Sequence, residues 1–495
     1  MPGDGSALEL SLRRHRTAAG DPYAAYLALR STWGERAVFL LESLAGPTAD
    51  RRSAAVGFDP VLHVAVHGER IDVSGVESLV RGVRAALREA GTVERSGDLW
   101  LTATCSLFDV PRAVERVFGA FDLDARAFGF GYLAIYGYDV VHHVERLPRL
   151  IAARPDAAAD LTLVVHRGVA VFDLAGGEVT LTTVEGDGLP EVDVASVLCE
   201  LASPAPAETD DGPLDVPSPD SVTDSTTPGR FHADVTTALG HIAIGDIYQV
   251  QLGHELTVET GVDELTVYRR LRERNPSPYM AIVPVGDLTM ISASPELFLR
   301  IEGDLMTMRP IAGTVRRTGD AVRDGEARHR LRADEKEIAE HTMLVDLCRN
   351  DLGRVAQVDS VDVDELMVVE DYSHVFHLVS NVTARVVPGV DAQDVVAATF
   401  PAGTMTGAPK IRAMEVIESL EDRRRELYAG AFGLIGFGGY VNLGLCLRTL
   451  FRSGTTYRTR ASAGVVADST PDGEWRETLS KLSAAYWAVT GEELT

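Results

Sequence analysis

The chain has 495 residues, 45% hydrophobic and 24% charged, which is typical of a soluble globular enzyme with two domains or one two-lobed domain. Its formal net charge of -26 argues against a surface for nucleic acid or anionic membranes, but it is compatible with a small anionic substrate. The four cysteines form no CxxC pair, the N-terminus lacks the apolar stretch of a secretory signal, and no apolar run could span a membrane, so we expect a cytoplasmic protein without disulfides or a zinc site.

The first 202 residues alternate strand-like and helical segments. Apolar runs at 63–73, 161–174 and 178–184 indicate strands, and the pattern at 76–90 indicates a helix. The Gly- and aromatic-rich run 126–141 suits central strands that approach a neighbouring backbone closely.

Residues 203–230 are rich in Pro, Asp, Ser and Thr and contain few apolar residues. Such a segment cannot bury a core and is typical of a linker or a long surface loop. We therefore divide the chain into an N-terminal part (1–202), a linker (203–230) and a C-terminal part (231–495).

The C-terminal part mixes both kinds of element. Helices are predicted at 263–275, 336–355 and 408–428, and strands at 279–285, 288–295, 296–303, 443–453 and 456–467. A short turn separates the first two strands, which favours antiparallel pairing and an α+β fold with two lobes.

Two predicted helices carry paired glutamates. Glu337 and Glu340 lie three residues apart on one helix, and Glu474 and Glu477 repeat that spacing on another. Carboxylates on facing helices can form the hard-oxygen site that Mg²⁺ prefers. From the residues alone, two solvated faces of a very acidic protein remain the alternative.

Other motifs carry less information by themselves. The chain contains no Walker A motif, no GxGxxG and no GxSxG, and the run 400–410 is compatible with a plain Gly/Pro turn before a helix. His377 lies in an apolar run, as a core histidine would. Arg448 lies inside a predicted buried strand, where a guanidinium requires an anion, so it indicates function.

Taken together, the ordered motifs of residues 231–489 resemble the chorismate-utilising enzymes, most closely anthranilate synthase component I. They are GDIYQV, NPSPYM, SASPELF, RPIAGT, EIAEHTMLVDLCRNDLGRV, HLVS, FPAGTMTGAPKIRAMEVIE, YAGAFG, LRT, ASAGVVADS and ETLSK. FLLES at 39–43 and GFGYLAIYGYD extend the resemblance into the N-terminal part. The resemblance implies a two-lobed antiparallel β-sandwich flanked by helices.

The resemblance also assigns roles to residues. It implies that Glu340 and Glu477 bind Mg²⁺, supported by Glu337 and Glu474, and that the ion holds the ring carboxylate of chorismate. Glu296 matches the acid that protonates the departing 4-hydroxyl, and His377 lies beside the reacting ring. The remaining catalytic and substrate contacts implied are Gln249, Gly313, Thr314, Thr404, Tyr428, Arg448, Ala463, Gly464 and Lys481.

Two positions predict the nucleophile. Water-using relatives carry a lysine base where this chain has Gln249, which cannot deprotonate water, so ammonia is expected. Ala312 replaces the lysine that forms a covalent adduct in aminodeoxychorismate synthases, which favours direct attack at ring carbon 2. The product of that step is 2-amino-2-deoxyisochorismate, and we expect the reaction to continue to anthranilate and pyruvate.

The chain departs from anthranilate synthases at Leu434, Asn442 and Leu443. This opens the alternative that the enzyme stops at the amino intermediate and serves specialised metabolism.

The resemblance further implies a regulatory site and a partner. Tryptophan feedback would involve Leu41, Glu42, Ser43, Asn275, Pro276, Tyr279 and Met280, although DRRS replaces the usual GRYS at 50–53. No cysteine lies in a GxCxG elbow, so we expect a separate glutamine amidotransferase subunit to supply the ammonia, in a homo- or hetero-oligomer.

Overall fold

The computed structural model describes residues 8–46, 53–119, 121–186, 188–203, 216–372 and 375–494. Its helices are α1 (Pro22–Trp33), α2 (Glu77–Glu89), α3 (Asp109–Phe118), α4 (Val141–Val144), α5 (Val194–Leu201), α6 (Pro228–Ala243), α7 (Glu264–Arg274), α8 (Ala321–Ala333), α9 (Glu335–Gly353), α10 (Ala392–Thr399), α11 (Lys410–Leu420) and α12 (Pro471–Thr490), with 3₁₀ turns η1 (Tyr138–Val140) and η2 (Gly403–Met405). None of these described helices has the length and apolar content needed to span a membrane.

The strands form two antiparallel sheets that share β3 and β8. In the first sheet the order is β1 (Leu10–Ala18), β9 (Glu178–Gly186), β8 (Leu161–Asp173), β3 (Ser53–His67), β2 (Val38–Glu42), β12 (Tyr279–Val285), β13 (Leu288–Ser294), β22 (Thr449–Ser453), β23 (Thr456–Val465) and β11 (Gln249–Glu259). Two short strands, β10 (Ser221–Asp224) and β19 (Gly407–Ala408), pair with the free edge of β11.

The second sheet runs from the other halves of β3 and β8. Its order is β5 (Val93–Arg95), β6 (Asp98–Trp100), β4 (Arg70–Gly75), β3, β8, β7 (Gly131–Tyr136), β20 (Ala431–Gly436), β21 (Val441–Leu445), β14 (Leu297–Glu302), β15 (Leu305–Met308) and β18 (Val375–Arg385), with β16 (Ile311–Arg316) and β17 (Asp362–Asp371) on the two edges of β18.

A bend in β3 lets one strand serve both sheets. Asp59 has a φ of 55°, and the pairing with β8 shifts register between Pro60 and Leu62. A bulge of this kind turns the direction of a strand without ending it. The two sheets therefore face each other across side chains such as Phe39, Val283 and Phe432, which form one buried cluster.

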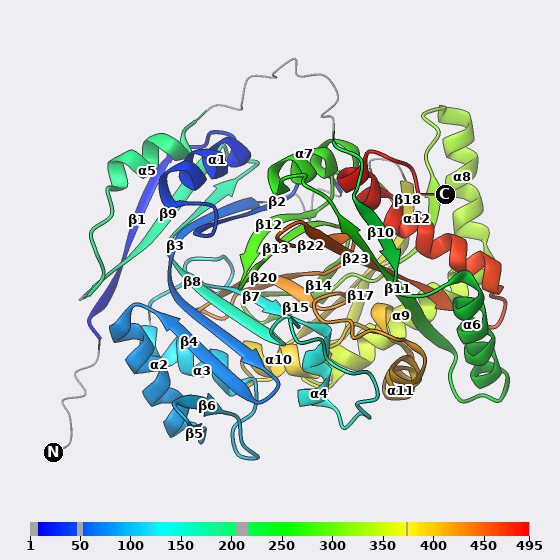
Figure 1. The fold of residues 1–495 in the computed structure, drawn as a ribbon, viewed down its shortest axis with the longest axis horizontal. Coiled ribbons are helices and arrows are strands. Elements are labelled where there is room, and N and C mark those ends of the chain that lie inside the picture. The colour runs from blue at the N-terminus through cyan, green and yellow to red at the C-terminus, as the bar shows by residue number, and fades with distance from the viewer. Residues whose placement is uncertain are drawn as a thin grey trace.

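Helices cover the outer faces of the sandwich. Figure 1 places α1 and α7 above the sheets and α2, α3 and α10 below them. Buried clusters join each group of helices to its sheet. The predicted class, an α+β two-lobed antiparallel sandwich flanked by helices, is confirmed.

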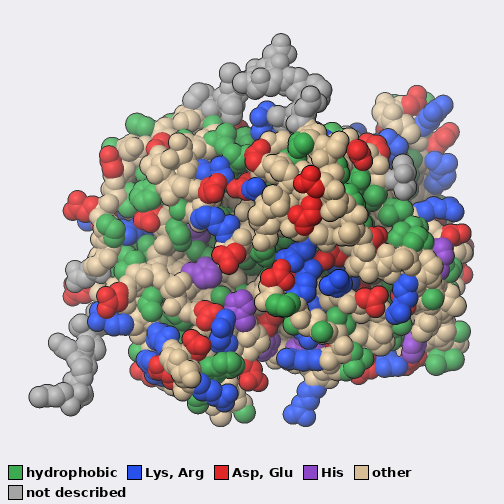
Figure 2. Space-filling view, viewed as in Figure 1, with side chains coloured by type: hydrophobic (Ala, Val, Ile, Leu, Met, Phe, Trp, Pro, Cys, Tyr) green, Lys and Arg blue, Asp and Glu red, His purple; other side chains and the backbone are tan. Residues whose placement is uncertain are grey.

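Both predicted parts of the chain contribute strands to both sheets. Strand β2 pairs with β12, and β7 pairs with β20. The division at 203–230 stays a prediction, and residues 204–215 of the predicted linker lie outside the described residues. On the face that Figure 2 shows, acidic and basic side chains are interspersed.

The helix predicted at 408–428 ends earlier than its pattern indicated. Helix α11 stops at Leu420, and residues 421–427 run as a loop. The reason is an ion-pair cluster in which Glu421 accepts from Arg425 at 3.0 Å and pairs with Arg460 at 2.6 Å. Burying that carboxylate between two guanidinium groups directs the chain away from the helix axis.

Candidate active site

Glu296 lies in the link between β13 and β14, where its side chain is buried. Burial raises the pKa of this carboxyl to about 8, and nearby Thr404, Lys481 and Arg448 oppose only part of the shift. The group is therefore protonated at neutral pH and can donate a proton.

His377 lies on β18, opposite Thr314 of β16. Its Nδ1 is 3.1 Å from the carbonyl oxygen of Gly313, which can only accept, so Nδ1 carries the proton. Burial, with Arg448 and Lys481 nearby, lowers the pKa of the imidazole to about 4, so the ring is neutral. The backbone of Thr314 is described, whereas its side chain lies outside the described part of the structure.

Gly313 provides the space beside this histidine. It has a φ of 57°, and the β16–β18 register shifts between Ala312 and Thr314. A Cβ at this position would lie 2.8 Å from Leu331 and 3.0 Å from the carboxylate of Glu337. Only glycine fits this bulge without strain.

Arg448 lies between β21 and β22 with a φ of 48°, a conformation that side chains seldom adopt. Burial lowers the pKa of its guanidinium, which Tyr372 and Glu296 partly counteract. Among the described residues no carboxylate forms an ion pair with it. A desolvated guanidinium of this kind is suited to an anionic ligand.

The two predicted glutamate pairs face one another. Helix α9 begins after Asp334, whose side chain accepts from the N–H groups of Lys336 and Glu337, and α12 begins after Thr470. Burial raises the pKa of Glu340 to about 7. Repulsion from Glu337 on the same helix and from Glu477 on α12 adds to this shift, and the positive charge of Lys336 opposes it.

A lysine lies beside one carboxylate on each helix. Lys336 Nζ is 3.6 Å from Glu340, and Lys481 Nζ is 2.7 Å from Glu477. Oε1 of Glu340 and Oε2 of Glu474 are buried, and no described residue donates a hydrogen bond to either oxygen. No three His, Cys, Asp or Glu side chains of the described residues are close enough to hold a metal by themselves.

The opposite wall of the site is formed by β11 and β23. A Cβ on Gly464 would lie 2.9 Å from the amide nitrogen of Gln249 and 3.0 Å from that of Gln251, so the glycine makes room for both amides. Ser462 shares this face, whereas strand alternation directs the buried Ala463 side chain to the other one. Only the backbone of Ala463 can therefore line the site.

Tyr428 and Lys481 are held against this wall. The Tyr428 hydroxyl is 2.8 Å from Ser462 Oγ, and Lys481 Nζ donates to the Ser462 carbonyl at 2.8 Å. Thr404 lies in η2, with its hydroxyl buried and without a hydrogen bond in the described structure. The predicted catalytic and substrate residues thus converge from separate elements.

The residues predicted for feedback lie in part around a second cavity, which is open to solvent and lies away from Glu296 and His377. Leu41, Glu42, Ser43, Tyr279 and Met280 line it, whereas Asn275 and Pro276 do not.

The substituted positions Leu434 and Asn442 line this same cavity, and Leu443 is buried in the core beside them. These departures therefore lie away from the reacting groups. Residues 50–52 of DRRS are outside the described residues.

Three residues of the site were not predicted. Ser462 lies inside the motif ASAGVVADS but was assigned no role, and Gln251 and Lys336 lie directly beside quoted motifs. The QVQ alternation could have indicated Gln251, since residues two apart on a strand share a face.

Comparisons with known proteins agree with this geometry. The family of chorismate binding enzymes matches residues 112–486. A 2-amino-4-deoxychorismate synthase of Streptomyces globisporus is 51% identical over 95% of this chain and 94% of its own length. Anthranilate synthase component 1 of Streptomyces coelicolor is 40% identical over 73% of each chain. The crystal structure of anthranilate synthase component I from Streptococcus pneumoniae has a TM-score of 0.72 at 30% identity, covering 88% of this chain and 92% of that one.

Proposed function

The chain belongs to the family of chorismate binding enzymes, and we propose that it aminates chorismate at ring carbon 2 with ammonia and releases the amino intermediate. The product keeps its enolpyruvyl group. The buried, protonated Glu296 beside the uncompensated Arg448 carries the proposal that this site performs the chemistry.

The choice of product rests on the relative from Streptomyces globisporus. Its name describes a chorismate with an amino group gained at carbon 2 and the 4-hydroxyl lost. These are the bond changes of 2-amino-2-deoxyisochorismate formation. The similarity of 51% over 95% of the chain supports this product more than 40% over 73% supports anthranilate.

The reacting groups suit this substitution. Ammonia forms the bond to carbon 2, the two ring double bonds shift, and the bond from carbon 4 to its hydroxyl breaks. Glu296 donates its proton to the departing hydroxyl, which leaves as water. The neutral His377 accepts a hydrogen bond beside the ring without adding a positive charge.

The amide of Gln249 favours ammonia over water as the nucleophile. Gln249 presents an amide where a base would be needed to activate water, and its Oε1 is buried without a hydrogen bond in the described structure. That oxygen can accept from an N–H of incoming ammonia and orient the nitrogen lone pair toward carbon 2. We propose that a separate glutamine amidotransferase supplies the ammonia.

The carboxylates of α9 and α12 fit a magnesium ion. No described residue donates to the buried Glu340 Oε1 or Glu474 Oε2, and burial, followed by repulsion from neighbouring glutamates, raises the pKa values of both carboxyl groups. A bound cation would offset both effects. Mg²⁺ needs only one or two carboxylates when a ligand and waters complete its coordination. We propose that Glu340 and Glu477 hold it, with Glu337 and Glu474 behind them, and that the bound ion neutralises the ring carboxylate of chorismate.

Arg448 and Tyr428 would hold the second carboxylate, on the enolpyruvyl group. Because no carboxylate of the described protein neutralises Arg448, the substrate supplies the missing charge. One dicarboxylate is thus held at both ends, with Glu296 and His377 between them.

The test is incubation with chorismate, MgCl₂ and ammonium chloride, followed by mass spectrometry. An aminated product that retains the enolpyruvyl group is expected. Anthranilate and pyruvate would support the second candidate, an anthranilate synthase component I, which the coverage and TM-score of the solved relative favour. Isochorismate or salicylate without incorporated nitrogen would contradict both.

A further inference from the structure

A chain of three side chains connects Tyr428 to β11. Tyr428 OH and Ser462 Oγ are 2.8 Å apart, and Ser462 Oγ donates to Gln251 Oε1 at 3.0 Å. Tyr428 and Ser462 are buried, and Gln251 is half-buried. We call these three residues the relay.

The strands fix the geometry of the relay. Gln251 pairs with Gly464, and Gly253 pairs with Ser462, so both relay residues lie on one face of the β11–β23 ladder. The backbone carbonyl of Gln251 accepts from Arg425 at 2.8 Å, and Arg460 lies 5.9 Å from the centre of the Tyr428 ring.

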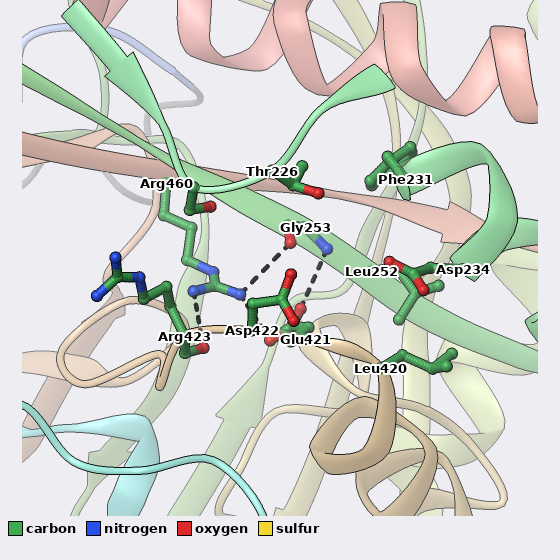
Figure 3. A pocket seen from close by; sticks show the side chains of 11 residues that line it. Thr226, Phe231, Asp234, Leu252, Gly253, Leu420, Glu421, Asp422, Arg423 and Arg460 are labelled. Atoms are coloured by element: carbon green, nitrogen blue, oxygen red, sulfur yellow. Dashed lines mark hydrogen bonds and ion pairs between the residues drawn. The ribbon is translucent and has the colours of Figure 1, made fainter. Parts of the chain in front are cut away.

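Several hydrogen bonds join the ion-pair cluster behind the relay to the backbone. Figure 3 shows Arg460 reaching the carbonyl groups of Gly253 and Arg423, and Glu421 accepting from the N–H of Gly253. These bonds and the strand ladder hold the backbone of the relay, and a half-turn of the Gln251 amide does not require that backbone to move.

Hydrogen-bond polarity gives the relay two states. A serine hydroxyl has one proton. If Ser462 donates to Gln251 Oε1, then Tyr428 must donate to Ser462, and only its lone pairs face the substrate. If the amide of Gln251 turns over, its nitrogen donates to Ser462, Ser462 donates to Tyr428, and the phenol proton is free to point into the site.

Only the second state suits a carboxylate ligand, because a carboxylate accepts hydrogen bonds and is repelled by lone pairs. We propose that Gln251 is a positioning residue: the orientation of its amide sets the direction of the relay, and an anionic substrate selects the orientation in which Tyr428 donates. The inference rests on the proposed function, in which Tyr428 contacts the enolpyruvyl carboxylate.

The test uses substitutions that fix or cut the relay. Gln251→Glu leaves a carboxylate that only accepts, so Ser462 must donate to it and Tyr428 must donate to Ser462. We expect KM for chorismate to rise at least about tenfold, the loss of one hydrogen bond to a charged group, with kcat nearly unchanged. Gln251→Leu leaves the proton of Ser462 free to point to Tyr428, so its KM should rise clearly less than that of Gln251→Glu.

A double variant separates the relay from simple charge repulsion. Ser462→Ala disconnects Gln251 from Tyr428, so Gln251→Glu combined with Ser462→Ala should recover most of the lost affinity. Direct repulsion of the substrate by the introduced carboxylate would persist in that variant. Likewise, Gln251→Glu should add little to Tyr428→Phe, which has no phenol proton to direct.

Two results would overturn the inference. One is an equal rise in KM for Gln251→Leu and Gln251→Glu, which indicates a packing role. The other is an absence of recovery in the double variant. If the wild-type enzyme neither binds nor converts chorismate, the proposed function fails first, and the two failures are thereby distinguishable.

Discussion

At the scale of single residues, the site works by holding charge states away from their ordinary values. Burial raises the pKa of Glu296 to about 8 and lowers that of His377 to about 4. Both groups are therefore neutral at pH 7, between a cationic Arg448 and a carboxylate cluster. An acid that is protonated and a ring that is uncharged suit the expulsion of a hydroxyl from a dianionic substrate.

Replacement of Glu296 by Gln should lower kcat about 10²- to 10⁴-fold, because the proton donor is lost while the shape is kept. In the wild-type enzyme at saturating Mg²⁺, kcat should fall as pH rises through about 8, where Glu296 loses its proton. The measurement is a pH–rate profile at constant free ammonia. If kcat of Glu296→Gln still falls as pH rises through about 8, another group causes that fall.

The same carboxyl affects stability. Its pKa lies above the ordinary 4.5, so its contribution is fully present below about pH 4.5 and is lost as pH rises through 8. Melting temperatures of Glu296→Gln should therefore match wild type at low pH and exceed it at pH 8.

Glu340→Gln should abolish turnover and weaken Mg²⁺ binding at least about tenfold, since the ion loses a charged ligand. Calorimetric titration with MgCl₂ alone measures the affinity without turnover. Glu335→Gln, at an exposed position on the same helix, is the matched control and should bind as wild type does. Equal affinities in all three proteins would exclude Glu340 as a ligand.

At the scale of elements, the sequence predicted features that depend on residues close together in the chain, and it did not predict contacts between residues far apart. The helical pattern of residues 336–355 predicted α9, and the spacing of the glutamates predicted their shared faces, because both follow from helical geometry alone. That α9 and α12 face one another could be anticipated only through the resemblance. Gln251 and Ser462 required the register of β11 on β23, a contact between residues 211 positions apart.

The second cavity, at β2 and β12, also depends on contacts between residues far apart in the chain. Leu434, Asn442 and Leu443 were interpreted as bearing on pyruvate elimination, because they depart from the residues usual in anthranilate synthases. The antiparallel pairing of β20 with β21 places Leu434 opposite Asn442, and both side chains line the second cavity. This placement depends on the strand pairing, so the motif alone could not predict it.

The cap of α9 offers a test at this scale. Asp334 accepts from the N–H groups of Lys336 and Glu337, at the start of the helix that carries the glutamates proposed to hold Mg²⁺. Asp334→Ala should destabilise the protein by about 1 kcal/mol and also weaken Mg²⁺ binding. Asp320→Ala removes the equivalent cap of α8 and should cost similar stability without affecting Mg²⁺. Similar Mg²⁺ affinities in the two variants would show that the cap of α9 does not affect Mg²⁺ binding.

At the scale of the whole molecule, the two sheets make the predicted parts interdependent. In both sheets a strand of residues 1–202 pairs directly with a strand of residues 231–495, β2 with β12 and β7 with β20. Phe39, fully buried between the sheets, packs on Gly57 and on the ring of His166 at 4.7 Å. Neither part can close its own hydrophobic core without strands from the other, so the predicted linker does not separate two independent folding units.

This architecture predicts one cooperative unfolding transition. Phe39→Ala should lower the free energy of unfolding by about 3–5 kcal/mol, because it leaves a cavity between the sheets. Urea denaturation followed by far-UV circular dichroism should shift together with that followed by tryptophan fluorescence in a Trp33→Phe/Trp100→Phe background, where only Trp475 and Trp487 of the C-terminal part report. Leu305→Ala, at a site 37% exposed, should move neither curve by more than about 1 kcal/mol. If Phe39→Ala shifts the dichroism curve while the C-terminal fluorescence transition stays at its wild-type midpoint, the two parts fold independently.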